Sequence, residues 1–525
     1  MYYVIPAWYG QERAWQMDLL PWYRTVQRLE FDDSIHQLRI LQELGQGQIL
    51  LLAYMPQLRY FLHRQDIYET KVYSVFDDLQ DIQSDQMQVL QIKDFSWPSD
   101  CDFIYTPFLV MVYRQDQLYA HIEFGQEGFI SQLKFFENQS LSQVQLLDDR
   151  GFVSSILYYD GDRLSHQDYL NPQGDWRFRR YEDGKSPHAL VINPRYQTDF
   201  KAPSYQSWED LIFERLADHL AGLQLAESNF ILAAHPNHQE ALFNLFPPEA
   251  AKILSFFVDR NRLEELDQLG ALIERADLVL TDRKDLLAGL NEHFPAAKAK
   301  FHHSPSFDSR LQLGLSQRRK ESKIYYQLDL NQILNEYALF KILQFVGQNP
   351  LTELVLAVYN GQEEGLKRVE AKVWELIEDY LKPEDFIKKA SKNPQSENQL
   401  EENQEIVYRL EVKNITDELS LIQELEYSRL IVDLNQEPHL YTQLAGISAG
   451  LPQINLVASE YVSHLENGYI LSEIAELPQV ANYYLEGLKN WNQALVYSID
   501  KIAQHTGQQL IERWQTWLGE VEHGR

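Results

Sequence analysis

The sequence is poor in cysteine, in long apolar runs and in basic charge. Its single cysteine, Cys101, excludes an intramolecular disulfide and a metal site built from several cysteines. No stretch approaches the about 18 consecutive apolar residues of a membrane span, and the N-terminus shows no basic leader before an apolar run. We therefore expect a cytoplasmic protein that contacts a membrane only indirectly or peripherally, and we expect it to carry no metal or cofactor.

Acidic residues outnumber basic ones, with 77 Asp and Glu against 47 Lys and Arg and a formal charge of −30. A field of this sign repels phosphate backbones and anionic lipid, which argues against nucleic acid as a partner. The local exception is the basic run of Arg177, Arg179 and Arg180, which we interpret as a solvated face. A length of 525 residues with 44% hydrophobic content is enough for several packed domains.

Short apolar runs alternate with amphipathic helical stretches, which predicts an α/β protein with two doubly wound, Rossmann-like parallel sheets in facing domains. The first series has six expected strands, at residues 2–7, 49–54, 72–76, 230–234, 253–258 and 278–281. The second has six more, at residues 324–328, 354–358, 406–410, 430–433, 454–457 and 469–471. Period-two alternation predicts an antiparallel insertion at residues 88–195. The expected domains are residues 1–87 with 196–315, the insertion, residues 316–500, and a C-terminal helix at 501–525 that crosses back to the first domain.

The segment from Glu437 to Pro452 resembles the sugar-nucleotide site of two-domain retaining glycosyltransferases. The comparable stretch of those enzymes carries two glutamates eight positions apart, and the second opens a short helix. Glu437 fills the first place, but the second falls on Ala445, whose methyl group cannot accept a hydrogen bond from a ribose. Losing the partner of a buried hydroxyl costs about 1–3 kcal/mol, so ordinary nucleotide-sugar binding is not expected. Glu437 is equally compatible with a structural acid at a helix N-terminus.

A second defect lies after the first strand of the second domain. Working enzymes of this class carry an Arg and a Lys there to neutralise the diphosphate, whereas this chain reads Ile324 to Gln332 without a cation, and Asp329 adds repulsion. The first-domain loop at Trp8-Tyr9-Gly10 offers one glycine where a close sugar contact usually needs a glycine-rich turn. We therefore assign no catalytic residue.

Several residues remain as candidate contacts in a vestigial cleft. His235 and His238 follow an expected strand, where related enzymes can contact the transferred sugar, although a solvent-facing loop is the favoured interpretation. Trp8 and Tyr9 end the first strand, where a doubly wound domain meets its ligand, and could contact carbohydrate or peptide. The full candidate set is Trp8, Tyr9, Gly10, His235, His238, Glu437 and Gln443.

Three other patterns are assigned no site. Asp160-Gly161-Asp162 resembles a metal-binding triplet but fits an ordinary hairpin turn. Gly446 to Gly450 matches a nucleophile elbow with the order of strand and helix reversed, so Gly450 is interpreted as the end of a helix. The adjacent pair His302 and His303 lies on an extended segment and points to opposite faces, so the two rarely share a metal.

The whole layout resembles the GT-B class of glycosyltransferases, in particular those that modify serine-rich adhesins. The opening from Met1 to Tyr9, the acidic balance and the order of the domains are similar to the first accessory secretory proteins of the accessory Sec export system. This resemblance implies a cytosolic, non-catalytic component that works with the second and third accessory proteins and a dedicated SecA motor to export glycosylated serine-rich adhesins. The alternatives are an active retaining glycosyltransferase with an altered donor site and a lectin-like chaperone.

Overall fold

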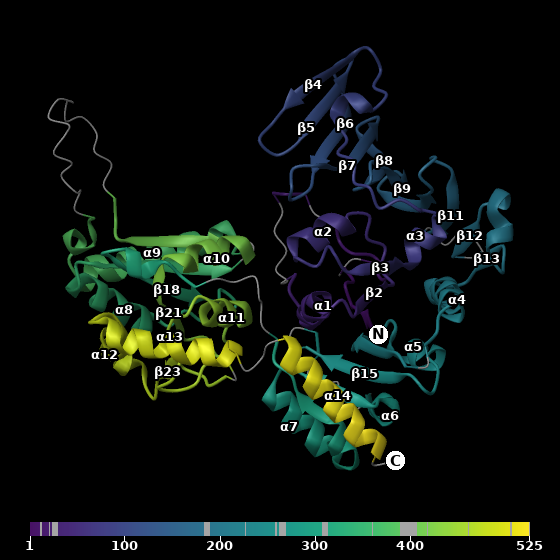
Figure 1. Ribbon diagram of the computed structural model, residues 1–525. Coiled ribbons are helices and arrows are strands. Elements are labelled where there is room, and N and C mark those ends of the chain that lie inside the picture. Colours follow the sequence, from purple (N-terminus) through teal and green to yellow (C-terminus); the bar gives the residue numbers. More distant parts are fainter. Residues whose placement is uncertain are drawn as a thin grey trace. The chain divides into compact units, whose positions relative to one another are not determined.

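The chain forms two compact units in the computed structural model (Figure 1). The structure describes residues 1–10, 13–19, 21–23, 30–182, 189–225, 227–257, 260–261, 269–306, 313–359, 361–388, 407–416, 418–459, 461–503 and 507–523. Unit 1 contains the described residues within 1–24, 31–306 and 510–525, and unit 2 contains those within 25–30 and 307–509. The exact boundaries proposed from the sequence remain predictions.

Unit 1 contains a seven-stranded parallel sheet in the order β17-β16-β15-β14-β1-β2-β3. Its strands are β1 (Tyr2–Ile5), β2 (Gly47–Leu51), β3 (Lys71–Ser74), β14 (Asn229–Ala233), β15 (Ala251–Phe256), β16 (Leu278–Thr281) and β17 (Phe301–His303). Strand β1 is buried along its whole length, as expected for a parallel strand covered on both faces. The sequence predicted six of these strands. It missed β17 as a strand because that segment is three residues long and two of them are histidines.

The second sheet of unit 1 is antiparallel and has ten strands, in consecutive order from β4 to β13. They are β4 (Cys101–Tyr105), β5 (Val110–Arg114), β6 (Gln117–Phe124), β7 (Ile130–Glu137), β8 (Ser140–Asp148), β9 (Phe152–Asp160), β10 (Arg163–Leu170), β11 (Trp176–Tyr181), β12 (Leu190–Ile192) and β13 (Ser204–Tyr205). The Asp160-Gly161 pair is part of the hairpin turn between β9 and β10, and Gly161 has a φ of 61°. Glycine takes that left-handed conformation without a steric penalty.

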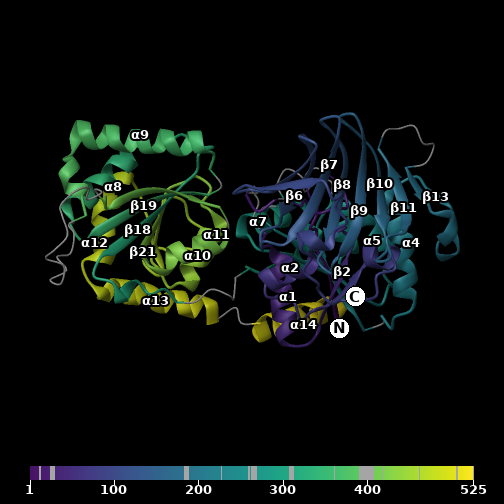
Figure 2. The same cartoon turned by 90° about the horizontal axis from the view of Figure 1, so that it is seen from above.

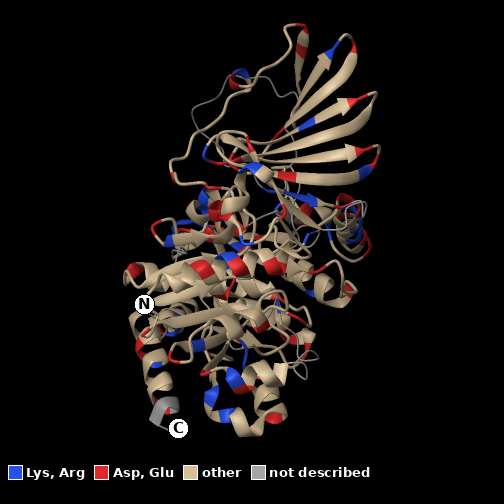
Figure 3. Ribbon diagram, turned by 90° about the vertical axis from the view of Figure 1, so that its right-hand side faces the viewer, with Lys and Arg blue, Asp and Glu red and all other residues tan. Residues whose placement is uncertain are grey.

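The run of Arg177, Arg179 and Arg180 on β11 is not a solvated face, which corrects the sequence-based interpretation. Arg177 is 4% exposed, and its guanidinium pairs with Asp199 at 2.8 Å. Arg179 binds both oxygens of Asp168, at 2.6 and 2.9 Å. Figure 3 shows both acidic and basic residues at the strand ends of this sheet. Alternation along β11 places neighbouring arginines on opposite faces, where each meets a different partner.

Helices cover the parallel sheet and its edges in unit 1, and the C-terminal helix returns to this unit. They are α1 (Asp33–Glu43), α2 (Leu58–Arg64), α3 (Val75–Leu79), α4 (Trp208–Ala221), α5 (Gln239–Leu245), α6 (Gly270–Arg275), α7 (Lys284–His293) and α14 (Gly507–His523). Helix α14 packs on unit 1 through Trp514, which is fully buried and contacts the ring of Tyr2, and through Trp517, which stacks on His302 at 4.2 Å.

Unit 2 contains a six-stranded parallel sheet in the order β20-β19-β18-β21-β22-β23. Its strands are β18 (Ser322–Leu328), β19 (Thr352–Tyr359), β20 (Leu410–Ile415), β21 (Ser428–Asp433), β22 (Gln453–Asn455) and β23 (Gly468–Ile470). Its helices are α8 (Glu336–Gln348), α9 (Glu363–Tyr380), α10 (Glu418–Glu426), α11 (Leu440–Ser448), α12 (Leu477–Leu485) and α13 (Leu488–Ala503). Within this unit the sheet lies between α9 and α13 (Figure 2). Strand β20 begins at Leu410, later than predicted, and the polar tract at 395–405 lies outside the described residues.

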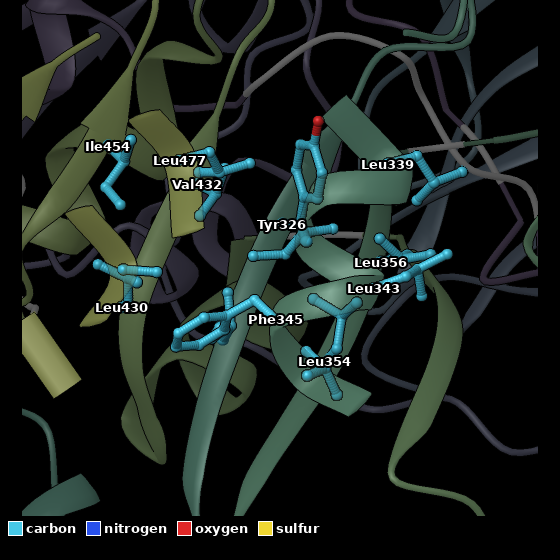
Figure 4. Packing of buried hydrophobic residues seen from close by; sticks show 14 of the residues in the cluster. Tyr326, Leu339, Leu343, Phe345, Leu354, Leu356, Leu430, Val432, Ile454 and Leu477 are labelled. Atoms are coloured by element: carbon cyan, nitrogen blue, oxygen red, sulfur yellow. The ribbon is translucent and has the colours of Figure 1, made fainter. Parts of the chain in front are cut away.

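The core of unit 2 is formed by apolar side chains of the sheet and of the helices that cover it (Figure 4). Leu339 and Leu343 on α8 are fully buried, and they pack in the same cluster as Leu356 and Val432 on the strands. Their spacing of four residues puts the two leucines on one face of the helix. Short 3-10 helices complete the described elements: η1 (Ile92–Asp94), η2 (Pro194–Asp199), η4 (Pro295–Lys300), η5 (Ser316–Arg318), η6 (Pro383–Phe386) and η7 (Ile474–Glu476). Among the described residues, every helix is too short or too polar to span a bilayer.

Candidate functional site

Both parallel sheets reverse their strand order next to the first strand, between β1 and β14 in unit 1 and between β18 and β21 in unit 2. In doubly wound sheets, ligands bind at the carboxyl ends of the strands at this reversal. Most of the residues singled out in the sequence follow one of these four strands. The molecule therefore has two candidate sites, one at the strand ends of each unit.

In unit 1 a hydrogen bond between Tyr9, after β1, and His238, after β14, joins the two segments that follow the strands at the reversal. The Tyr9 hydroxyl lies 2.8 Å from His238 Nδ1, and His238 Nε2 donates to the carbonyl of Ala233 at 2.8 Å. Burial lowers the pKa of His238 to about 3, so the imidazole is neutral and its Nδ1 accepts the tyrosine proton. His238 is fully buried, which contradicts a solvent-facing loop at this residue. Since both ring nitrogens are engaged, His238 cannot act as a general base without losing a contact.

Trp8 lies at the same strand ends of unit 1, where it contacts a network of buried charged side chains. Its indole Nε1 donates to Asp32 at 3.2 Å, and Asp32 caps α1 by accepting from the Ile35 amide at 2.9 Å. The next residue, Asp33, receives two 2.9 Å hydrogen bonds from Arg260, and both side chains are 3% exposed. The Arg260 Nε also donates to the carbonyl of Ala234 at 3.0 Å. The one cation described at this edge is thus already paired with carboxylates of the protein itself.

The remaining unit 1 candidates lie around this network. The half-buried His235 places its ring 4.9 Å from that of Tyr9, and its Nδ1 accepts from the amide of Asn237 at 3.2 Å. Gly10 approaches Asp18 closely: a Cβ on Gly10 would lie 2.1 Å from its carboxylate. Gly10 is therefore required for close packing of the protein itself. Trp8 and Tyr9 are 6% and 5% exposed, which leaves little of either ring for a ligand.

In unit 2, neutral polar groups form the hydrogen bonds between the segments at the reversal. Gln327, at the end of β18, accepts hydrogen bonds from Tyr325 at 2.9 Å and from Thr442 on α11 at 3.1 Å. The Asn435 side chain, after β21, donates to the Gln327 carbonyl at 3.4 Å. Gln327 and Thr442 are buried, so this network ties α11 to the sheet.

Two carboxylates and a neutral histidine lie beside this network. Asp433 is fully buried at the end of β21 and accepts from the amides of His439 at 2.7 Å and Asn435 at 3.1 Å. Burial raises the pKa of Asp433 to about 7, and the nearby Asp329 acts in the same direction. Burial also lowers the pKa of His439 to about 4. Among the described residues, no Lys or Arg forms an ion pair with Asp329 or Asp433. The position where a diphosphate would need cations is therefore acidic, as the sequence indicated.

Three residues of the 437–452 segment, Glu437, Ala445 and Gln443, differ in burial and in their position relative to α11. Glu437 is exposed and lies two residues before His439, which caps α11, so it belongs to neither the first turn nor the buried network. Ala445 is 2% exposed in the middle of α11. Gln443 is also buried on α11, and its Nε2 has no partner among the described residues. None of the three presents an exposed carboxylate on α11.

Gly450 ends α11, as the sequence predicted. Its φ is 72°, its amide donates to the Ile447 carbonyl at 3.0 Å, and the Leu451 amide donates to the Gly446 carbonyl at 2.8 Å. This pair of hydrogen bonds is a Schellman motif, which a left-handed glycine allows. The serine in this segment therefore lies at a helix end, and no nucleophile elbow is present at Ser448.

Sequence reasoning missed four residues that form the buried ion pair and hydrogen bonds at these strand ends: Asp33, Arg260, Asp433 and His439. Asp433 had a usable signal, because an acid directly after a buried apolar strand lies at the carboxyl edge. Arg260 had none, since its partner is 227 positions earlier. Within the described residues, no three His, Cys, Asp or Glu side chains are grouped as metal ligands.

The comparisons with known proteins agree over nearly the whole chain. A protein-family profile for the first accessory Sec system protein matches residues 1–521. A curated protein of the same description from Streptococcus gordonii is 56% identical over 523 residues, which cover 99% of both chains. A chain in the crystal structure of accessory secretory proteins 1, 2 and 3 of Streptococcus pneumoniae is 41% identical with a TM-score of 0.90, and the match covers 100% of both.

A more distant likeness concerns the fold alone. The pneumococcal O-GlcNAc transferase GtfA, solved with UDP and GlcNAc, is 12% identical with a TM-score of 0.65 over 99% of both chains. Together with the two doubly wound sheets and the antiparallel sheet, it confirms the predicted GT-B-like fold class.

Proposed function

The chain belongs to the family of first accessory Sec system proteins, and from this premise we propose that it is a non-catalytic component with a glycosyltransferase-like fold that assists adhesin export. In this proposal it assembles with the second and third accessory proteins and cooperates with the accessory SecA motor on glycosylated serine-rich adhesins. The pneumococcal crystal structure, which holds accessory secretory proteins 1, 2 and 3 together, supports the first part. The motor and the substrate rest on the family resemblance.

The observation that carries the non-catalytic role is the strand end of unit 2. A nucleotide diphosphate placed there would meet Asp329 and the buried Asp433, with no paired cation among the described residues. Removing its charges from water without a cation costs several kcal/mol. The buried methyl group of Ala445 adds the loss of a ribose contact. Both effects act in the same direction, against donor binding.

Calorimetric titration of the full chain with UDP-GlcNAc, with and without Mg²⁺ or Mn²⁺, tests this proposal. We expect no saturable heat up to about 1 mM, which corresponds to a binding free energy weaker than about −4 kcal/mol. An active retaining glycosyltransferase assayed in parallel gives the positive signal. Micromolar binding, or transfer of the sugar to a serine-rich peptide, would instead establish the alternative of an active enzyme with an altered donor site.

The export role is tested by complementing a strain that lacks the native gene. Because catalysis is not required, His235→Ala and Glu437→Ala should leave adhesin export and co-purification with the second and third accessory proteins unchanged. An empty vector should abolish export. If either variant stopped export while the complex still assembled, a purely structural role would be untenable. If the unmodified chain failed to co-purify with those proteins, the assembly itself would be rejected.

A further inference from the structure

Unit 1 contains a polar cavity whose lining residues differ from those of both strand-end networks. Its volume is about 620 Å³, within the range of pockets for small ligands. It is lined by the loop after β1, by β10 and β11, by the hairpin that joins β9 to β10, and by the start of α4. A smaller cavity of about 250 Å³ shares Ala14, Arg180 and Trp208 with it.

Three guanidinium groups reach this cavity from three separate segments. Arg13, from the N-terminal loop, donates through Nη1 to Gln167 at 2.7 Å, and Gln167 is neutral. Arg163, from the hairpin, is exposed. Within the described ranges neither Arg13 nor Arg163 has an ion pair with a carboxylate. Arg180 lies over the ring of Trp208 at 5.4 Å and pairs with Glu182 at 2.8 Å. Among the described residues, the cavity therefore holds two guanidinium groups without an ion pair, and the carboxylates of Asp160 and Glu182 also line it.

Tyr169 supplies a neutral donor to the wall of the cavity. The side chain is 2% exposed and lines the cavity. Burial raises its pKa, while the nearby charges of Arg13 and Arg180 lower it, so the hydroxyl stays protonated near both cations. Its ring is fixed by stacking on Phe178 at 4.7 Å and by an edge contact with Trp208 at 5.4 Å. A protonated phenol hydroxyl at the wall of the cavity can donate one hydrogen bond to a ligand.

We propose that this cavity binds a small hydroxyl-bearing oxyanion of the class of sugar phosphates and acidic sugars. The oxyanion pairs with Arg13 and Arg163, since planar guanidinium groups bind phosphate and carboxylate through two parallel hydrogen bonds. The Tyr169 hydroxyl and the acid Glu182 contact the ligand's hydroxyl groups. The site is independent of the donor position in unit 2, so it does not rest on the proposed export role.

Calorimetry on the full chain at low salt tests the site with glucose 6-phosphate and glucuronate, which separate phosphate from carboxylate recognition. Inorganic phosphate and neutral glucose are the comparison ligands. We expect one site per chain for a charged sugar, and binding of glucose that is weaker by about tenfold or more, because the ion pairs are lost. Binding of the charged sugar should also weaken as salt is added.

Variants locate the site. Arg163→Gln is the first choice because the side chain is exposed and folding should survive. It should weaken binding of the charged sugar about tenfold, as should Arg13→Gln, and Tyr169→Phe should weaken it a fewfold. Arg195→Gln is the matched control, since Arg195 is 69% exposed and pairs with Asp175 outside the cavity. Circular dichroism verifies that each variant is folded.

Three results would overturn the proposal. The first is the absence of saturable binding by either charged sugar at about 10 mM. This result would mean a binding free energy weaker than about −3 kcal/mol. The second is equal binding of glucose and glucose 6-phosphate, which would indicate a neutral glycan site. The third is an equal effect of Arg163→Gln and Arg195→Gln, which would place the binding elsewhere.

Discussion

The two parallel sheets share one kind of strand-order reversal, yet different kinds of side chain lie at the strand ends beside it. In unit 1 the reversal carries a buried ion pair between Arg260 and Asp33 and a hydrogen bond between the neutral side chains of Tyr9 and His238. In unit 2 the reversal carries acids and amides, with Asp433 held by backbone amides and Gln327 by hydroxyls. Among the described residues, the same topology therefore leads to one edge with a paired cation and one edge without a cation.

This difference shows two ways in which a strand-order reversal can lack an available cation among the described residues. The unit 1 edge has a cation, but its arginine is already bound and its histidine is neutral. The unit 2 edge has polar groups, but the charges have the wrong sign. A topological switch point predicts where a ligand would bind, whereas the side chains decide whether one can bind.

Breaking the unit 1 network should have the largest effect. Arg260→Gln leaves the Asp33 carboxylate buried without a cation, and removing one partner of a buried pair costs about 3–5 kcal/mol. Urea denaturation of the full chain measures the loss. The control is Arg283→Gln, since Arg283 pairs with Asp285 and both side chains are more than 40% exposed. Such surface pairs contribute less than about 1 kcal/mol, so equal effects would contradict a stabilising role of the buried Arg260–Asp33 pair.

Restoring the missing glutamate of unit 2 should damage the fold without restoring a donor site. Ala445→Glu forces a longer, charged side chain into a position 2% exposed, and we expect a loss of about 3 kcal/mol. UDP-GlcNAc binding should not appear, because Asp329 still repels a diphosphate and no Lys or Arg among the described residues pairs with the acids of this edge. Ala371→Glu, at an exposed position of α9, should change the stability by less than about 0.5 kcal/mol. Gained nucleotide binding would contradict the acidic-edge explanation.

The two edges should respond to pH with opposite signs. The folded-state pKa of Asp433 is about 7, above its unfolded value of about 3.9, so its contribution to stability falls as the pH rises between these values. Asp433→Asn removes that contribution. The difference in unfolding free energy, variant minus native, should therefore rise with pH by up to about 1.4 kcal/mol per unit between about pH 4.5 and 6.5.

His238 gives the opposite slope. Its folded-state pKa is about 3, below its unfolded value of about 6.5, so its contribution to stability rises with pH across that window. After His238→Gln, the same difference should fall with pH by up to about 1.4 kcal/mol per unit. Urea titrations at about pH 4.5, 5.5 and 6.5 measure both variants, within the window that these pKa values define. If the change in unfolding free energy had the same pH slope for Asp433→Asn and His238→Gln, the predicted opposite pH dependence would be wrong.

The smallest effect is expected at Glu437. This side chain is exposed and outside the first turn of α11, so Glu437→Gln should change the unfolding free energy by less than about 0.5 kcal/mol. Glu424→Gln is the buried counterpart, since Glu424 is 5% exposed and pairs with Lys323 and Lys413 at 2.7 and 2.6 Å. Thermal unfolding compares the two. An equally large loss at Glu437 would show a structural role that its position does not predict.

Local patterns were enough to predict most of the fold. Buried strands such as Ile324 to Leu328 are short, mainly apolar runs, and alternation at residues 118–124 predicted the antiparallel sheet. The hairpin at Gly161 and the helix end at Gly450 follow from the conformational freedom of glycine. The missed strand β17 and the late start of β20 are segments at sheet edges, where little apolar burial marks the sequence.

The sequence by itself determined the two doubly wound sheets, the antiparallel insertion and the acidic end of β18, because these depend on residues close together in the chain. It placed Tyr9 and His238 at strand ends without showing that they bind each other. Only the tertiary structure decided which charges are neutralised, because partners such as Asp33 and Arg260 are brought together by sheet topology. Burial then set the protonation of His238 and Asp433, and burial depends on the packing of the whole unit.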